Sequence, residues 1–388
     1  MNMKTKFRVA IVAASFAANT VRLASADGPV RCWGDNTFGQ SSPPTDLGNA
    51  RMVAGGHNHS LAILSDGTVR CWGQNDAGQC DVPSNLGRVR SIAAGGSFSV
   101  AILDSGFVRG WGDNYWGQCT PPPSLGVATG IDAGLAHSVA LRSDGTVVAW
   151  GYGGYGACDV PGGLSDVSRV AAGAFSGVAL RRDGTVIGWG SRGDGAFWCP
   201  QDLSDLVDFA STYFWSTAIR ADRSVRSWEN GVAAPADVGP CWQIAGGGYH
   251  VAAITSNGSI RCWGDDGSAQ CQVPEGVFLA EAVAAGRAHS LAIVAPDCDG
   301  NGIADFIDIK SGSVADLNTD GVPDTCQQPT CTEADLFANG VVNGADLGIL
   351  LSEWGSASAG SLSDINLDGQ VDGSDLGTLL AFWGPCTN

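Results

Sequence analysis

Carboxylate and amide side chains near the C-terminal end have the types and spacing that best fit a chemical role. A first loop places oxygen-bearing side chains at positions 1, 3, 5, 9 and 12, namely Asp297, Asp299, Asn301, Asp305 and Asp308. Position 6 is Gly302, which permits the sharp turn that such a loop needs. Because Ca²⁺ binds several oxygen ligands in a loop of this spacing, the pattern predicts a calcium site.

Three further loops repeat this pattern, one of them completely and two of them with a ligand position changed. One copy offers Asp316, Asn318, Asp320 and Asp324 but has Gln327 at position 12. The copy nearest the C-terminal end is complete, with Asp364, Asn366, Asp368, Asp372 and Asp375. The copy before it has Asp335, Asn339, Asn343 and Asp346, but Phe337 occupies a ligand position, which puts its calcium affinity in doubt. The segments Leu347 to Trp354 and Leu376 to Trp383 are predicted to be short helices.

The histidines and carboxylates outside these loops do not predict an active site. Four of the five histidines recur at one position of a sequence repeat, at His59, His137, His250 and His289. A catalytic residue normally occurs once, whereas a periodic residue is usually architectural. No pair of carboxylates can be assigned to glycoside cleavage. We therefore predict no catalytic residue.

The first residues are typical of an export signal, which we expect to comprise residues 1–26. Lys4, Lys6 and Arg8 precede an apolar run, and Ala24 to Ala26 fits a cleavage site. Export would place the chain outside the cell or at its surface, without a membrane span. The formal net charge of −18 disfavours nucleic-acid binding, because such a surface repels phosphate.

An exported chain with thirteen cysteines favours disulfides over catalytic thiols or zinc sites. The predicted pairs are Cys71 with Cys80, Cys262 with Cys271, Cys298 with Cys326, and Cys331 with Cys386. The partners of Cys32, Cys119, Cys158, Cys199 and Cys241 stay open.

A tryptophan repeat organises residues 28–295. Seven of the thirteen tryptophans recur at a regular spacing, with five intervals of 39 residues and a last one of 35. They are Trp33, Trp72, Trp111, Trp150, Trp189, Trp228 and Trp263. Each unit has short apolar runs separated by turns, and Asp-Gly turns such as Asp66-Gly67 predict hairpins. Short strands at this period predict an all-β propeller.

The two ends of the array complement each other. The first unit starts at Val30 to Trp33 without a preceding partner strand, and the last ends at Ser290 to Val294 without a tryptophan strand. If these segments pair, the ring closes as seven blades, whereas a solenoid would need capping units. We expect the seven-bladed β-propeller to be followed by a calcium-loop linker at 296–328 and a small α-helical module at 329–388.

These repeats resemble the RCC1-like (regulator of chromosome condensation) propeller family. The resemblance rests on seven Trp positions, most of them followed by Gly, and on the A-G-x-x-H-S pattern, and it covers residues 28–295. Its V-P-x-x-L-G connection is similar to the secreted bacterial members, including the propeller that inhibits β-lactamases. The units at Trp189 and Trp228 depart most from the pattern. Residues 331–386 resemble type I dockerin modules, which bind cohesin domains, so a cohesin-like receptor for the tail is implied.

Aromatic residues that break the repeat are the candidates for a partner-binding face. We assign Phe98, Phe175, Phe214 and Tyr249 to the loop position just before the repeated histidine, and Tyr213 and Trp215 flank Phe214. A weaker second set follows the Trp-Gly pairs, at Phe38, Tyr115, Trp116, Tyr152 and Tyr155. Rigid aromatic side chains bury a large area at small entropic cost and so anchor interfaces. Aromatic packing at the end of the propeller is the other interpretation.

The sequence therefore predicts a secreted, non-enzymatic and monomeric binding scaffold. Its propeller would recognise a protein or glycan, and its Ca²⁺-stabilised, dockerin-like tail would tether it to a surface or assembly. Two alternatives stay open: a component of an extracellular, cellulosome-like complex that degrades polysaccharide, and a proteinaceous enzyme inhibitor.

Overall fold

The structure, a computed structural model, describes residues 28–190, 203, 205–229, 232–275, 277, 279–294, 314, 334–337, 341–356, 361–366 and 369–385. Contacts between Cα atoms divide the chain into two compact units, one ending at Val294 and the other including Ala295–Asn388. None of the helices in the described segments has the length and apolar character needed to cross a membrane.

An antiparallel three-stranded sheet is the repeating element of the first unit. In its first copy, β2 (Asn49–Gly55) pairs with β3 (His59–Leu64), which pairs with β4 (Val69–Gly73). The β3–β4 hairpin turns at Gly67, whose φ of 84° suits glycine. Asp66 fixes this turn because its Oδ1 accepts hydrogen bonds from the backbone N–H and the hydroxyl of Thr68. The predicted Asp-Gly hairpin is thus confirmed.

Five further sheets repeat this strand order. They are β5 (Val89–Ala94), β6 (Phe98–Leu103) and β7 (Val108–Gly112); β8 (Ala128–Ala133), β9 (His137–Arg142) and β10 (Val147–Gly151); β11 (Val167–Ala172), β12 (Ser176–Arg181) and β13 (Val186–Gly190); β14 (Leu206–Ser211), β15 (Trp215–Arg220) and β16 (Val225–Glu229); and β17 (Cys241–Gly246), β18 (His250–Thr255) and β19 (Ile260–Gly264).

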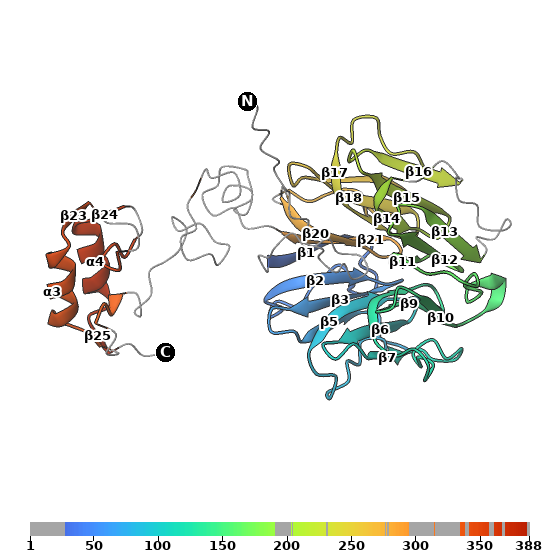
Figure 1. The fold of residues 1–388 in the computed structure, drawn as a ribbon, viewed down its shortest axis with the longest axis horizontal. Helices are drawn as coiled ribbons and strands as arrows, with labels where there is room; N and C mark the ends of the chain where they lie inside the picture. Colours follow the sequence, from blue (N-terminus) through green and yellow to red (C-terminus); the bar gives the residue numbers. More distant parts are fainter. Residues whose placement is uncertain are drawn as a thin grey trace, which may run out of the picture. The chain divides into compact units, whose positions relative to one another are not determined.

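The remaining strands of this unit come from both ends of the repeat array. β20 (Ala280–Ala285) pairs with β21 (His289–Val294), and β21 pairs with β1 (Gly28–Gly34) in a register from Val30 opposite Ile293 to Gly34 opposite His289. β1 lies beside β21 in Figure 1. The first strand of each sheet contacts the first strand of the next, and β20 contacts β2.

Apolar layers between consecutive sheets form the core. Met52, Ile63 and Ile92 pack with Trp111 in one such layer. All seven repeated tryptophans are buried, with between 4% and 7% of their surface exposed. A buried tryptophan contributes a large apolar area but needs a hydrogen-bond partner for its indole N–H. For Trp72 this partner is the backbone carbonyl oxygen of Gln40, which lies 2.9 Å from the indole nitrogen. The tryptophans therefore serve the packing of the sheets.

The described part of the second unit contains two copies of a segment with a short strand, a helix and another short strand. α3 (Gly344–Ser352) begins after its N-cap Asn343, and α4 (Gly373–Ala381) begins after its N-cap Asp372. Both helices start three residues earlier than the apolar pattern predicted, because these caps accept backbone N–H groups at the helix start. The short strands pair crosswise: β22 (Val341–Val342) with β25 (Gly384–Pro385), and β23 (Gly355–Ser356) with β24 (Gln370–Val371). Figure 1 shows the two helices.

Candidate binding face

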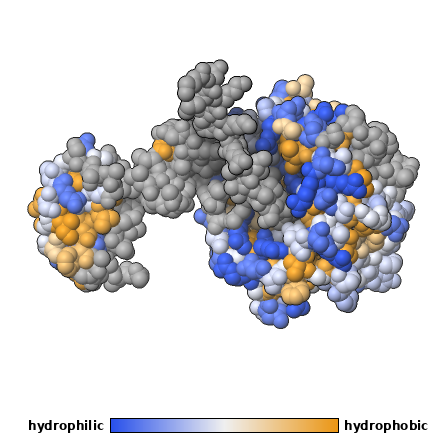
Figure 2. Space-filling view, in the orientation of Figure 1, coloured by the Kyte–Doolittle hydropathy of each residue, from blue (hydrophilic) through white to orange (hydrophobic). Residues whose placement is uncertain are grey.

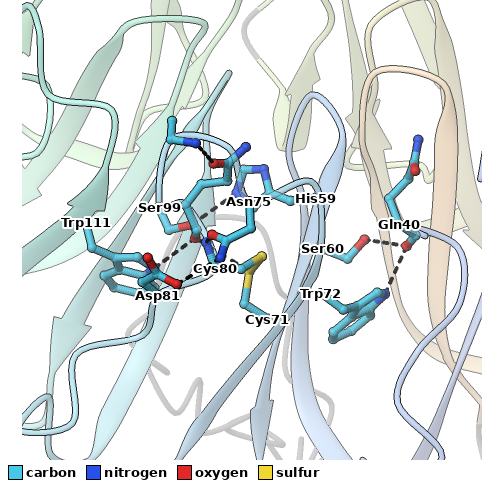
Figure 3. Close-up of a disulfide and its surroundings, with 12 residues drawn as sticks. Gln40, His59, Ser60, Cys71, Trp72, Asn75, Cys80, Asp81, Ser99 and Trp111 are labelled. Atoms are coloured by element: carbon cyan, nitrogen blue, oxygen red, sulfur yellow. Dashed lines mark hydrogen bonds between the residues drawn. A yellow bond between two sulfur atoms is a disulfide. The ribbon is translucent and has the colours of Figure 1, made fainter. Parts of the chain in front are cut away.

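The repeated histidines join neighbouring sheets by hydrogen bonds. Nε2 of His59 lies 3.0 Å from Oγ of Ser99 in the next sheet. That hydroxyl donates to the carbonyl oxygen of Gln79, which also accepts the indole N–H of Trp111, both at 2.9 Å. Figure 3 shows this chain of contacts beside the disulfide. The motif residues thus connect one sheet to the next.

The same connection recurs around the unit. His250 contacts Ser290 and His289 contacts Ser60, each at 2.9 Å, while His137 reaches the Ser176 carbonyl at 3.3 Å. Burial lowers the pKa of His59, His137 and His250 to about 4 and that of His289 to about 3. These imidazoles are neutral and enclosed at pH 7, which is consistent with an architectural role.

Two disulfides brace individual loops, as predicted. Cys71 bonds to Cys80 and Cys262 bonds to Cys271, each over a sequence separation of 9 with Cα atoms 5.0 Å apart. Cys32, Cys119, Cys158 and Cys241 are free thiols in the described part of the chain. Cys32 occupies the repeat position of Cys71, and Ser41 occupies that of Cys80.

Replacing Ser41 with cysteine is expected to create a third disulfide, with Cys32. The equivalent Cα separation of 5.0 Å in the two native pairs suits a disulfide. Burial raises the pKa of the Cys32 thiol to about 12, so the chain is unfolded without reductant before alkylation, and mass spectrometry should then show that Cys32 is protected in S41C. In the control S42C, the new thiol is on the exposed neighbouring residue and both thiols should stay reactive. An alkylated Cys32 in S41C would contradict the equivalence of the loops.

Two of the predicted face residues are in the core. Phe98 is 0% exposed and Trp215 is 6% exposed. Counting 39-residue repeats from His59 places both at the histidine position itself, where the side chain packs between sheets. Their inclusion in a binding face is therefore wrong.

The other predicted residues lie at one end of the sheets, which we call the loop face. It comprises the connections between first and second strands and the residues that follow each third strand; in the first sheet, Gly55, His59 and Gly73 mark it. The opposite end, formed by turns such as Asp66-Gly67, is called the hairpin face. Phe214 and Tyr249 are 42% and 38% exposed on the loop face.

A narrow cavity of about 80 Å³ is lined by the ends of the first strands and by the loops after them. The Tyr213 hydroxyl lies 3.1 Å from Nδ1 of His57, although the two residues are 156 positions apart. Burial and the nearby Arg287 lower the pKa of His57, and burial raises the pKa of Tyr213. Tyr213, Phe214 and Tyr249 form a cluster of contacting rings here. The neutral His57–Tyr213 pair therefore joins two distant loops at the cavity.

A second aromatic group, which we call the aromatic strip, joins loops of three consecutive repeats. Its members are Tyr115, Trp116, Tyr152, Tyr155 and Phe175. Ring centroids are 4.8 Å apart for Tyr115 and Trp116, 4.9 Å for Trp116 and Tyr152, and 5.1 Å for Tyr155 and Phe175. Tyr115 is 81%, Trp116 51% and Tyr155 62% exposed. Phe175, predicted to belong with Phe214, thus contacts the set predicted to be weaker.

Two rings of the strip stand at the same position of the repeat. Trp116 and Tyr155 occupy one position, where Phe38 and Ala77 stand in other loops. Tyr155 adopts a φ of 60° at the turn η1 (Gly154–Gly156). A non-glycine residue rarely takes this conformation, which here accompanies an exposed ring. The sequence predicted that these aromatic residues lie in loops, but it did not predict that their rings contact one another.

The described parts of the C-terminal loops resemble each other. In the last copy, Oδ2 of Asp364 accepts the N–H of Gly369, at 2.9 Å, and Gly369 has a φ of 86°. Asp375 and Asp346 are both 0% exposed and cap the helix starts. The Phe337 side chain is 63% exposed. Among the residues that can be described, no three His, Cys, Asp or Glu side chains gather at metal-binding distance.

Several predictions fall outside the described residues. These are the export signal at 1–26, most of the linker at 296–328, the pairs Cys298–Cys326 and Cys331–Cys386, Cys199, and the ligand positions Asp297, Asp299, Asn301, Asp305, Asp308, Asp316, Asn318, Asp320, Asp324, Asn339 and Asp368.

Comparison with known proteins agrees with the repeat architecture. The model of the regulator of chromosome condensation (RCC1) repeat matches residues 53–79, 89–118, 128–157 and 243–270. No curated protein matches the chain by sequence.

Solved structures are similar in fold. Prp20p from Saccharomyces cerevisiae, described together with its binding to Gsp1p and histones, has 17% identity and a TM-score of 0.61, with 71% of this chain and 92% of that one covered. Human WBSCR16 has 16% identity and a TM-score of 0.58, with 69% and 100% covered. The ectodomain of the Arabidopsis thaliana receptor kinase ACR4 has 19% identity and a TM-score of 0.52, with 64% and 94% covered. The chain therefore has a fold similar to that of RCC1-like propellers, and four of its segments match the RCC1 repeat.

Proposed function

We propose that this protein is an exported, non-enzymatic scaffold that binds a protein partner through its loop face. The aromatic strip carries the proposal, because it exposes several contacting rings outside the packed layers of the sheets. Aromatic anchors of this kind dominate the binding energy of protein interfaces. Prp20p, which shares the fold and binds proteins, supports a protein as the partner.

A closed ring of seven blades is part of the proposal. The pairing of β1 with β21 and the contacts of each first strand with the next support it. Closure would hold the loops rigidly on one face, and a rigid surface loses less entropy on binding.

The C-terminal unit is proposed to be a calcium-stabilised tether. The Asp364–Gly369 hydrogen bond and the positive φ of Gly369 fit a calcium loop, and the described residues that would hold the ion are Asp364, Asn366, Asp372 and Asp375. Leu351, Trp354, Leu380 and Trp383 are each at least 50% exposed and form two equivalent pairs. Figure 2 shows apolar residues gathered on the drawn face of this unit. They are a candidate surface for a cohesin-like receptor.

Removing calcium is expected to loosen the C-terminal unit and leave the propeller folded. Ion binding stabilises only the state in which the ligands are assembled. Limited proteolysis with Ca²⁺ and with a chelator should differ within residues 297–388 only. D364A should lose more of this protection than D335A, because the loop of Asp335 has Phe337 at a ligand position, and the two carboxylates are matched in burial. Identical cleavage with and without Ca²⁺ would refute the calcium assignment.

Capture experiments test the binding face. The full chain, immobilised, should retain a partner from the native extracellular fraction, and the variant Y115A/W116A/Y155A should lose it. F107A removes a 60% exposed ring from the hairpin face and should capture normally. Equal capture by both variants would refute the loop face as the binding surface.

Glycan binding, polysaccharide degradation and enzyme inhibition each predict a different result in capture and activity assays. Stacking of Tyr115 and Trp116 on sugar rings would give capture of glycans instead, and polysaccharide hydrolysis would show an enzyme. A captured enzyme that loses activity when bound would identify an inhibitor.

A further inference from the structure

Charged residues are distributed unevenly between the two faces of the propeller. The first-to-second strand connections and the six residues after each third strand, as far as they are described, hold five aspartates but only one arginine, Arg287. The five are Asp35, Asp76, Asp113, Asp265 and Asp266. His57, also on this face, has a lowered pKa and is neutral at pH 7.

The other described arginines lie within strands or towards the hairpin face. Examples are Arg142 at the end of β9, Arg181 at the end of β12, and Arg88 just before β5. Their described ion pairs lie away from the loop face: Arg70 with Asp46, Arg88 with Asp104, Arg169 with Asp208, and Arg220 with Asp205. None of the five loop-face aspartates has an ion pair within the described segments.

Hydrogen bonds orient these aspartates without neutralising them. The Asp113 carboxylate accepts the N–H of Tyr115 and the amide of Gln118. Asp265 accepts the amide of Gln270 in the same way. Because every donor is uncharged, the negative charge of these groups stays available to a cation from outside.

The aromatic strip lies between two carboxylates, those of Asp113 and Asp159. Asp113 is two residues before Tyr115 at one end of the strip. At the other end, a methyl group placed on Gly156, next to Tyr155, would lie 3.4 Å from Oδ2 of Asp159. Asp159 is exposed. Exposed rings beside unpaired carboxylates attract a lysine or arginine side chain by both cation–π and charge interactions.

We propose that the aromatic strip binds a lysine- or arginine-bearing segment of the partner protein, an inference that rests on the proposed function. The aromatic rings would pack on the aliphatic stems and face the charged ends, while Asp113 and Asp159 would pair with them. Such binding weakens as salt rises, because the carboxylates are exposed and screened.

Peptide binding to the full chain tests this inference. A synthetic peptide of alternating lysine and glycine is expected to bind in calorimetric titrations, whereas matched peptides with glutamate or serine in place of lysine should not. The variant Y115A/W116A/Y155A is expected to bind the lysine peptide at least about tenfold more weakly. The variant D113Q/D159N should also weaken it; Gln74 stands at the position of Asp113 in another repeat, so glutamine is compatible with the loop.

A matched charge control separates the site from general attraction. D144N/D183N removes two exposed carboxylates from the hairpin face and should bind the lysine peptide like the unchanged protein. If this control weakens binding as much as D113Q/D159N, or if the aromatic variant binds normally, the inference is wrong. Native partner capture that needs the strip, without lysine-peptide binding, would overturn this inference and leave the proposed function intact. Capture that does not need the strip would overturn the proposed function.

Discussion

Acidification from pH 6.5 to pH 4 is expected to lower the free energy of unfolding of the propeller by several kcal/mol. The folded pKa of His59, His137 and His250 is about 4, against 6.5 for the free side chain. Below pH 6.5 the unfolded chain therefore binds protons that the folded chain excludes. Stability is lost as pH falls, by up to about 3 kcal/mol for each buried imidazole.

Two buried carboxyl groups act in the opposite direction. Burial raises the pKa of Asp132 to about 6 and raises that of Asp208. A raised pKa stabilises the folded state at low pH, so these groups offset part of the loss. Four buried histidines outnumber them, and the net effect of acid is destabilising.

The variant H59F isolates the histidine contribution. Phe98 shows that the equivalent site accepts a phenylalanine, and Ser138 beside it still donates to the Gln118 carbonyl. Denaturant unfolding at pH 7 and pH 4.5 should show a smaller loss of stability in H59F, by about 2 kcal/mol. Equal losses in both proteins would contradict a neutral, buried His59.

Adding a methyl group at Gly134 is expected to destabilise the propeller by about 3 kcal/mol. A Cβ atom there would lie 2.2 Å from Cε1 of His137 and 2.4 Å from the Gly173 carbonyl oxygen. The first is a buried ring and the second is backbone of the next sheet, so neither can move away easily. The glycine of the A-G-x-x-H motif is therefore required by close packing.

G153A provides the control for G134A. The nearest atom to a Cβ on Gly153 is 4.0 Å away, and the φ of Gly153 is −89°. Thermal unfolding should show a large loss of stability in G134A and almost none in G153A. Similar midpoints for the two variants would contradict the packing described around His137.

Repeated residues allowed the fold to be predicted from the sequence. The tryptophan spacing and the Asp-Gly turns predicted the repeated antiparallel sheets, because the same residues form the same local turns and strands in each unit. The cysteine spacing predicted Cys71–Cys80 and Cys262–Cys271 for the same reason.

The binding face was predicted less well, because it depends on contacts between units. Phe98 and Trp215 were mistaken for loop residues, although the repeat length places them at the buried histidine position. Trp116, Tyr152 and Phe175 come from three consecutive repeats, and only the arrangement of the sheets brings their rings together.

Hydrogen exchange of the propeller with its captured partner bound tests the central claim most directly. The claim is that the aromatic strip on the loop face is the binding surface. Amides of residues 113–118, 152–157 and 173–175 are expected to be protected by the partner, whereas the hairpin turns at 65–68, 143–146 and 182–185 should exchange as in the free protein. Protection confined to the hairpin turns, with the strip unchanged, would contradict the account.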